Sequence, residues 1–127
     1  MVPGVEIAVG YVFAWAVRKA RLVAGRADAE VDRAVEAGMD RVHRVVSGKL
    51  GGDQALAQVE EEAGAEPAEL AAETRQWLEL SLNRAATRDA EFAAALVAAV
   101  QAVQSAESAE SAEGPRRARA ASRSAGT

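Results

Sequence analysis

The chain has 127 residues, of which 50% are hydrophobic, 27% are charged and only 4% are aromatic, so its size is that of one small domain. It contains no cysteine and one histidine, which excludes disulfides, thiol nucleophiles, zinc ribbons and multi-histidine metal sites. The formal net charge of -4 argues against a general coat for nucleic acid.

Residues 1–25 form the most unusual segment of the sequence. Ile7–Val17 is an uncharged apolar run, shorter than the roughly 20 residues that a membrane-spanning helix needs. Large apolar residues also alternate at every second position from Val5 to Val17, which fits a β-strand. A lone strand would have no partner in a chain whose other segments are helical. We therefore predict an apolar N-terminal helix ending at Gly25, which would have to be buried all round.

An amphipathic helix is predicted next, from an N-cap at Asp28 to about Val46. Its charged residues lie on one side, and its apolar stripe is about 140° wide, as in a helix that packs on one face. The glycine-rich turn of residues 47–52 is expected to end it. The stripe comprises Val31, Ala34, Val35, Gly38, Met39, Val42, Val45 and Val46.

A short third helix is predicted over Gln54–Ala63. Asp53 is its expected N-cap, and Gly64 is expected to stop it. Leu56 and Val59 are three residues apart and are predicted to face inward.

Two further helices complete the predicted domain. The fourth has Pro67 in its first turn and runs to about Ala86. The fifth is alanine-rich and runs from an N-cap at Asp89 to about Gln104. The predicted inner face of the fourth helix holds Leu70, Ala71, Trp77, Leu78, Ser81, Leu82 and Ala85, and that of the fifth holds Phe92, Leu96, Val100 and Val103.

The C-terminal tail is predicted to be disordered over residues 105–127, with the alternative that its Ser-Ala-Glu units extend the fifth helix for a turn or two. It repeats Ser-Ala-Glu three times and then becomes rich in arginine, without large apolar residues that could offset the entropy of ordering. The predicted fold is thus a single all-α domain over residues 1–104, a bundle of four to five helices, followed by this tail.

The sequence carries no catalytic constellation. His43 has no nucleophile to pair with and is expected on the surface. Gly48–Lys49 lacks the flanking residues of a phosphate-binding loop. Glu60–Glu62 are consecutive on a helix and point in different directions, so they cannot converge on one metal ion. We predict a protein without enzymatic activity, metal, cofactor or small-molecule substrate.

Nucleic-acid binding is the alternative of a different class. The turn at residues 48–53 between two helices resembles a helix-turn-helix, but the recognition helix would carry only negative charges, which phosphate repels. We therefore do not expect nucleic acid as a partner, and a DNA-associated accessory protein is kept as the alternative function.

The N-terminal helix gathers Tyr11, Phe13 and Trp15 within five residues, and Arg18, Lys19 and Arg21 follow directly. Three interpretations stay open: a central core helix, an oligomerisation element, and a membrane anchor whose basic residues hold lipid headgroups. We predict that the three aromatic residues form the main association surface of a cytoplasmic interaction or adaptor module. Its partner would be another protein or a second copy, with a membrane surface as the alternative.

Two stretches, Val5–Arg21 and Gly25–His43, resemble a family of small actinobacterial helical proteins, and the resemblance covers about Val5 to Val103. Members are described as uncharacterised, and some carry the label "chromosome partitioning protein". The resemblance implies an adaptor-like protein near conflict or signalling systems and supplies no catalytic residue. Such proteins often end in a tail rich in glycine and valine. The tail here is rich in serine, alanine and arginine, so no tail-dependent role is carried over.

Overall fold

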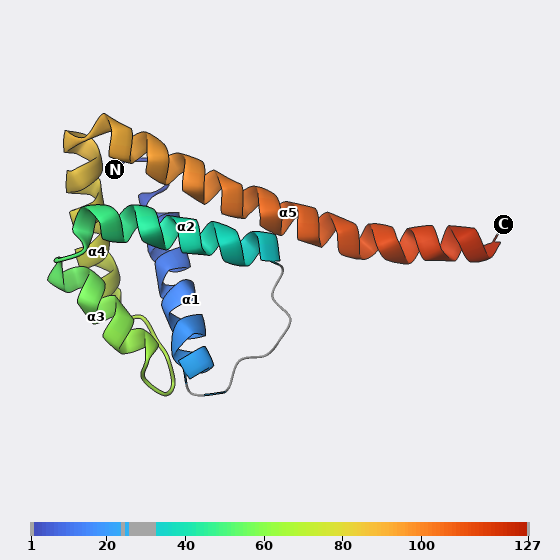
Figure 1. Cartoon of the computed structure of the whole chain (residues 1–127), viewed down its shortest axis with the longest axis horizontal. Coiled ribbons are helices and arrows are strands. Elements are labelled where there is room, and N and C mark those ends of the chain that lie inside the picture. The colour runs from blue at the N-terminus through green and yellow to red at the C-terminus, as the bar shows by residue number, and fades with distance from the viewer. Residues whose placement is uncertain (1, 24, 26–32, 127) are drawn as a thin grey trace.

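The computed structural model describes residues 2–23, 25 and 33–126, with the side chains of those up to residue 109. The described chain is helical and contains no strand, which confirms the predicted all-α class for this part of the chain. Its helices are α1 (Val5–Val23), α2 (Arg33–Leu50), α3 (Gln54–Ala63), α4 (Ala72–Arg88) and α5 (Ala90–Gly126) (Figure 1).

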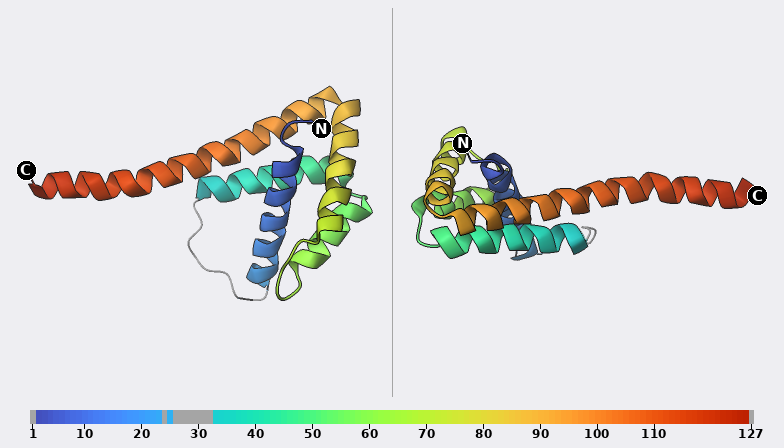
Figure 2. Two further views of the ribbon diagram at one scale, coloured as in Figure 1. Left: turned by 180° about the vertical axis from the view of Figure 1, so that it is seen from behind. Right: turned by 90° about the horizontal axis from the view of Figure 1, so that it is seen from above.

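The helices pack around α1, which contacts each of the other four. α2 and α5 lie side by side in every view, and α3 and α4 form a helical hairpin against α1 (Figure 1, Figure 2). The C-terminal part of α5 extends well beyond the other helices (Figure 2). The bundle therefore consists of α1 to α4 and the first half of α5.

The core consists mainly of valine, leucine and alanine contributed by all five helices. Leu56 and Val59 of α3 are buried, as predicted, and so is the whole predicted stripe of α5. Because the core side chains are small, the helices can approach each other closely. The largest fully buried side chains are Val5, Val9, Val12, Val42, Val46, Val59, Leu78, Leu82, Leu96 and Val103.

Helix α1 confirms the choice of helix over strand for the N-terminal segment. Its expected end is also found, because Gly25 has a φ of 72° and its N–H donates to the Leu22 carbonyl at 3.1 Å. The expectation that α1 is buried all round is wrong, since Ile7 and Ala14 are exposed on its outer side. Burial is confined to one side, which holds Val5, Ala8, Val9, Val12 and Ala16.

Helix α2 extends to Leu50, beyond the predicted end at Val46, and Gly51 and Gly52 form the turn that follows. The predicted N-cap Asp28 lies outside the described residues. Gly38 faces α5, where a Cβ atom added to it would lie 2.8 Å from Val103 Cγ2 and 3.3 Å from Val103 Cα. Real Cβ atoms essentially never come as close as the first of these distances, so glycine permits the close approach of α2 and α5.

The two predicted aspartate caps that lie within the described residues are confirmed. The Asp53 carboxylate accepts a hydrogen bond from the Ala55 N–H at 2.8 Å, at the start of α3. The Asp89 carboxylate accepts from the Phe92 N–H at 3.1 Å, at the start of α5. It also accepts from Lys49 Nζ at 2.8 Å, and this bond, with that of Phe92, lowers the pKa of Asp89. Lys49 thus links the end of α2 to the start of α5.

Helix α4 begins at Ala72, and the prediction of Pro67 in its first turn is wrong. The N-cap residue Ala71 has no side chain that could cap the helix, and the Glu62 carboxylate of α3 takes that role. Glu62 accepts from the Ala71 N–H at 2.7 Å and from the Thr74 hydroxyl. The Thr74 hydrogen bond, followed by that of Ala71, lowers the pKa of Glu62. This carboxylate therefore caps the start of α4.

The buried side of α4 agrees with the predicted one at Leu78 and Leu82 and differs at Trp77. Thr74, Leu78, Leu82 and Ala86 are buried, whereas Trp77, predicted to face inward, is 43% exposed. The Thr74 hydroxyl can be buried because Glu62 accepts its hydrogen bond. The helix is thus rotated so that its indole lies toward the outside.

Helix α5 continues to Gly126, beyond the predicted end near Gln104. Val103 is its last buried residue among the described side chains. The disorder predicted for residues 105–127 stays a prediction.

Candidate interaction surface

Tyr11 joins α1 to α5. Its hydroxyl donates to Glu107 Oε1 at 2.5 Å. Burial of the ring raises the pKa of Tyr11 to about 12, and the hydrogen bond and negative charge of Glu107 act in the same direction. The half-buried ring also packs against the core, so only part of it is open to another molecule.

Trp15 joins α1 to α2. Its indole Nε1 donates to the Asp40 carboxylate, and its ring stacks on His43 with ring centroids 3.5 Å apart and an interplanar angle of 11°. Lys19 Nζ lies 5.6 Å from the centre of the indole ring. His43 Nε2 also lies 3.4 Å from Glu60 Oε1 of α3, and its side chain is only 15% exposed. His43, which was expected on the surface, is therefore largely covered by its contacts with Trp15 and α3.

Phe13 is half-buried and packs against the hydrophobic core. All three aromatic residues that the sequence analysis assigned to an association surface thus make contacts within the chain. Their role in association stays a prediction.

The basic residues after the apolar run have different environments. Arg18 binds Glu36 of α2 through two nitrogens, Nε and Nη2, each 3.3 Å from a carboxylate oxygen. Lys19 Nζ lies 3.9 Å from the Asp40 carboxylate. Arg21 is exposed and lies at a pocket. Two of the three cations that would hold lipid headgroups in the membrane-anchor interpretation are therefore paired within the chain.

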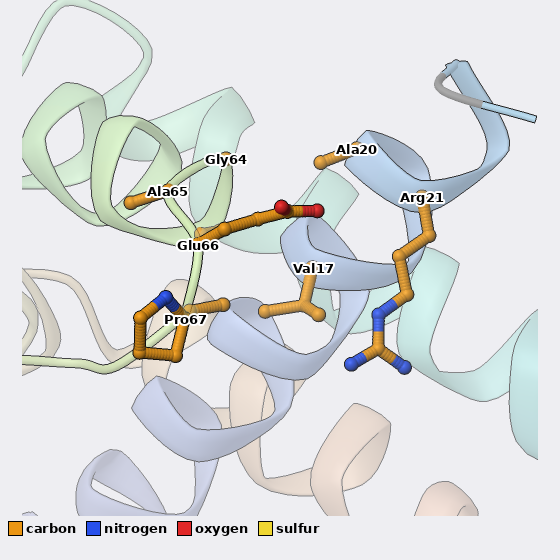
Figure 3. A pocket seen from close by; sticks show the side chains of 9 residues that line it. Val17, Ala20, Arg21, Gly64, Ala65, Glu66 and Pro67 are labelled. Atoms are coloured by element: carbon orange, nitrogen blue, oxygen red, sulfur yellow. The ribbon is translucent and has the colours of Figure 1, made fainter. Parts of the chain in front are cut away.

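The pocket at Arg21 has a volume of about 370 Å³ and lies between the C-terminal half of α1 and the loop that joins α3 to α4. Figure 3 shows the Glu66 side chain extending from this loop toward α1, and Arg21 on the α1 side of the pocket. Both signs of charge are present, and the other lining side chains are small and apolar, so the pocket selects neither anions nor cations. It is lined by Val17, Ala20, Arg21, Ala63, Gly64, Ala65, Glu66, Pro67 and Ala68.

Exposed large apolar side chains lie on two helices. Among the residues that the structure describes, they are Ile7, Leu22 and Val23 of α1 and Trp77 and Leu80 of α4. Leu80 is 58% exposed and Val23 is 91% exposed. The exposure of the two on α4 is not predicted above, although the charged residues Glu73 and Arg84 lie at helical spacing from them and indicate a solvent-facing side.

The titration of Tyr11 gives a direct test of the α1–α5 contact, because the chain has one tyrosine. We expect its ultraviolet absorbance to titrate near pH 12 in the folded chain, against an ordinary value of 10.0. A raised pKa means that the folded state favours the neutral phenol, so Tyr11 adds to the free energy of unfolding while it is protonated. This stabilisation is fully present below pH 10 and is lost as the pH rises toward 12. Glu107→Gln should lower the midpoint only in part, since burial remains. A midpoint near 10 with circular dichroism of a folded chain would contradict the buried position.

No group of three or more His, Asp or Glu side chains in the described chain is placed to hold a metal ion. None of the described helices has both the length and the apolar composition that crossing a membrane requires. No protein-family model, curated protein or solved structure matches the chain.

Proposed function

We propose that this chain is a non-enzymatic helical interaction module that binds a protein partner through the apolar side chains exposed on α1 and α4. The observation that carries the proposal is that the exposed large apolar residues of the described chain all lie on these two helices, which contact each other. Exposed apolar surface is a mark of interaction sites. An adaptor role is also what the resemblance to small actinobacterial helical proteins implies.

The charges around α1 favour a protein partner over a bilayer or DNA. Headgroup or phosphate binding needs free cations, and the Arg18 and Lys19 side chains are already paired with carboxylates of α2. DNA binding is disfavoured for a second reason. The helix that would act as the recognition helix, α3, carries Glu60–Glu62 and no basic residue. A surface of apolar groups with paired charges is typical of protein contacts.

The test uses a photo-crosslinking amino acid at one position of the full chain, in cells of the organism that produces it. We expect crosslinked protein species with the probe at Ile7 on α1 or at Leu80 on α4. The matched control places the probe at Ala94, which is exposed on α5. The proposed surface would be refuted if crosslinked species formed equally with the probe at position 94. It would also be refuted if none formed with the probe at positions 7 and 80.

Two binding assays test the alternatives. The chain should not float with vesicles of phosphatidylcholine and phosphatidylglycerol, and it should not shift duplex DNA in a gel at physiological salt. Flotation that is lost on Ile7→Ser would replace the protein partner with a membrane surface. A persistent gel shift would favour the DNA-associated alternative.

A further inference from the structure

The outer side of α4 carries a row of exposed residues at spacings of four, three and four. Glu73, Trp77, Leu80 and Arg84 are all exposed. Residues at these spacings lie on one side of a helix, and the same spacing marks the contact positions of coiled coils. None of the four side chains forms a hydrogen bond or ion pair with another residue whose side chain the structure describes. The row is thus a complete helix face without a partner inside the described part of the chain.

The row is symmetric in a way that matters for pairing. Trp77 and Leu80 lie at equal distances on either side of the midpoint of the row, and Glu73 and Arg84 lie at equal distances farther out. The outer positions carry opposite charges, and the inner positions carry large apolar side chains. Two copies of the row placed antiparallel would therefore set Glu73 of each copy against Arg84 of the other.

We propose that two copies of this chain associate through α4, antiparallel and related by a two-fold axis at the midpoint of the row. Trp77 of one copy packs against Leu80 of the second copy, and each end of the contact is closed by a pair formed by Glu73 and Arg84. This inference rests on the proposed function, because it takes the α4 part of the proposed surface and names its partner. A parallel pairing would place like charges together at both ends and is disfavoured.

The contact is small. α4 has 17 residues, which corresponds to about 25 Å of helix, and a single pair of helices buries less area than a standard interface. We expect a dissociation constant of about 10–100 µM, at the weak end for specific protein contacts. The net charge of -4 on each copy opposes association, but repulsion beyond about 8 Å is screened at physiological salt. The attraction between Glu73 and Arg84 at each end of the contact acts over a shorter distance, so salt screens it less.

The test is sedimentation equilibrium of the full chain from about 5 µM to about 1 mM, a range that brackets the expected constant. The wild-type chain should pass from monomer to dimer. Glu73→Arg and Arg84→Glu should each weaken association by about tenfold, because each change puts like charges together at both ends of the contact. Arg44→Glu on α2 is the matched control for a reversed surface arginine and should leave association unchanged.

The decisive measurement mixes the two charge-reversed chains. In the antiparallel pairing, position 73 of one chain meets position 84 of the other. The Glu73→Arg chain has positive charges at both positions and the Arg84→Glu chain has negative charges at both, so only the mixed pair restores opposite charges at both ends. We expect the equimolar mixture to associate about as strongly as the wild-type chain, with circular dichroism showing that all variants are folded.

Two results overturn the proposal. One is a wild-type chain that stays monomeric, and the other is an equimolar mixture that associates no more strongly than either variant alone. If the chain is monomeric while crosslinks at Leu80 still form to another protein, the dimer fails and the proposed function stands.

Discussion

Replacing Leu82 by alanine is expected to lower the free energy of unfolding by about 3–5 kcal/mol. Leu82 has no exposed surface and lies in the core that α4 forms with its neighbours. The loss combines the transfer free energy of the removed atoms with the cost of the cavity, because the surrounding helices relax only in part. A small domain has a total stability of about 5–15 kcal/mol, so this change removes a large share of it.

Leu80→Ala is the matched control for this prediction. It makes the same chemical change two residues away, at a side chain that is 58% exposed. Measured by urea unfolding in dilute solution, where the chain is monomeric, it should cost less than about 0.5 kcal/mol. Equal losses for the two variants would show that α4 is rotated differently about its axis.

The second large effect is expected for Gly38→Leu. The added side chain would enter the contact between α2 and α5, where even a Cβ atom would lie 2.8 Å from Val103 Cγ2. The Val103 side chain can rotate away from the added Cβ atom. The Val103 Cα, however, would lie 3.3 Å from this Cβ atom, and it can move away only if α5 moves. We expect a loss of about 3 kcal/mol or more in the free energy of unfolding, from overpacking at a close contact of two helices.

Gly48→Ala separates this steric effect from the general effect of replacing glycine in a helix. Gly48 lies in the same helix, and a Cβ atom there would meet nothing within 4 Å. This variant should gain about 0.5–1 kcal/mol, because alanine loses less backbone entropy on folding. Thermal unfolding of both variants checks the sign of each effect, and a Gly38→Leu chain as stable as the wild type would contradict the close approach at Gly38.

Local signals made most of the fold predictable. Asp53 and Asp89 were found as caps because an N-cap depends on a side chain and backbone N–H groups only two or three residues away. The buried stripe of α5 followed from the helical repeat of large apolar residues in an alanine-rich segment. These features depend on spacing along the chain, and the sequence contains that information directly.

Features that depend on distant residues were missed. The sequence predicts Pro67 in the first turn of α4, because proline suits that position and nothing near Ala72 indicates a cap, whereas the cap comes from Glu62 of α3. The helical spacing of the apolar residues predicts Trp77 on the inner face, whereas Thr74 is buried there, and its burial depends on the same glutamate. The stack of Trp15 on His43 requires α1 and α2 to be docked, a contact that hydrophobic periodicity does not encode.

The capping of α4 by Glu62 has a consequence for how the chain opens locally. One carboxylate holds the end of α3, through Gln58 Nε2 at 3.0 Å, and the start of α4, through Ala71. Fraying of the last turn of α3 therefore removes the acceptor that satisfies the first turn of α4, and both turns lose their protection together. We therefore expect the last turn of α3 and the first turn of α4 to open together, so that the amides of these two turns exchange hydrogen with similar opening free energies.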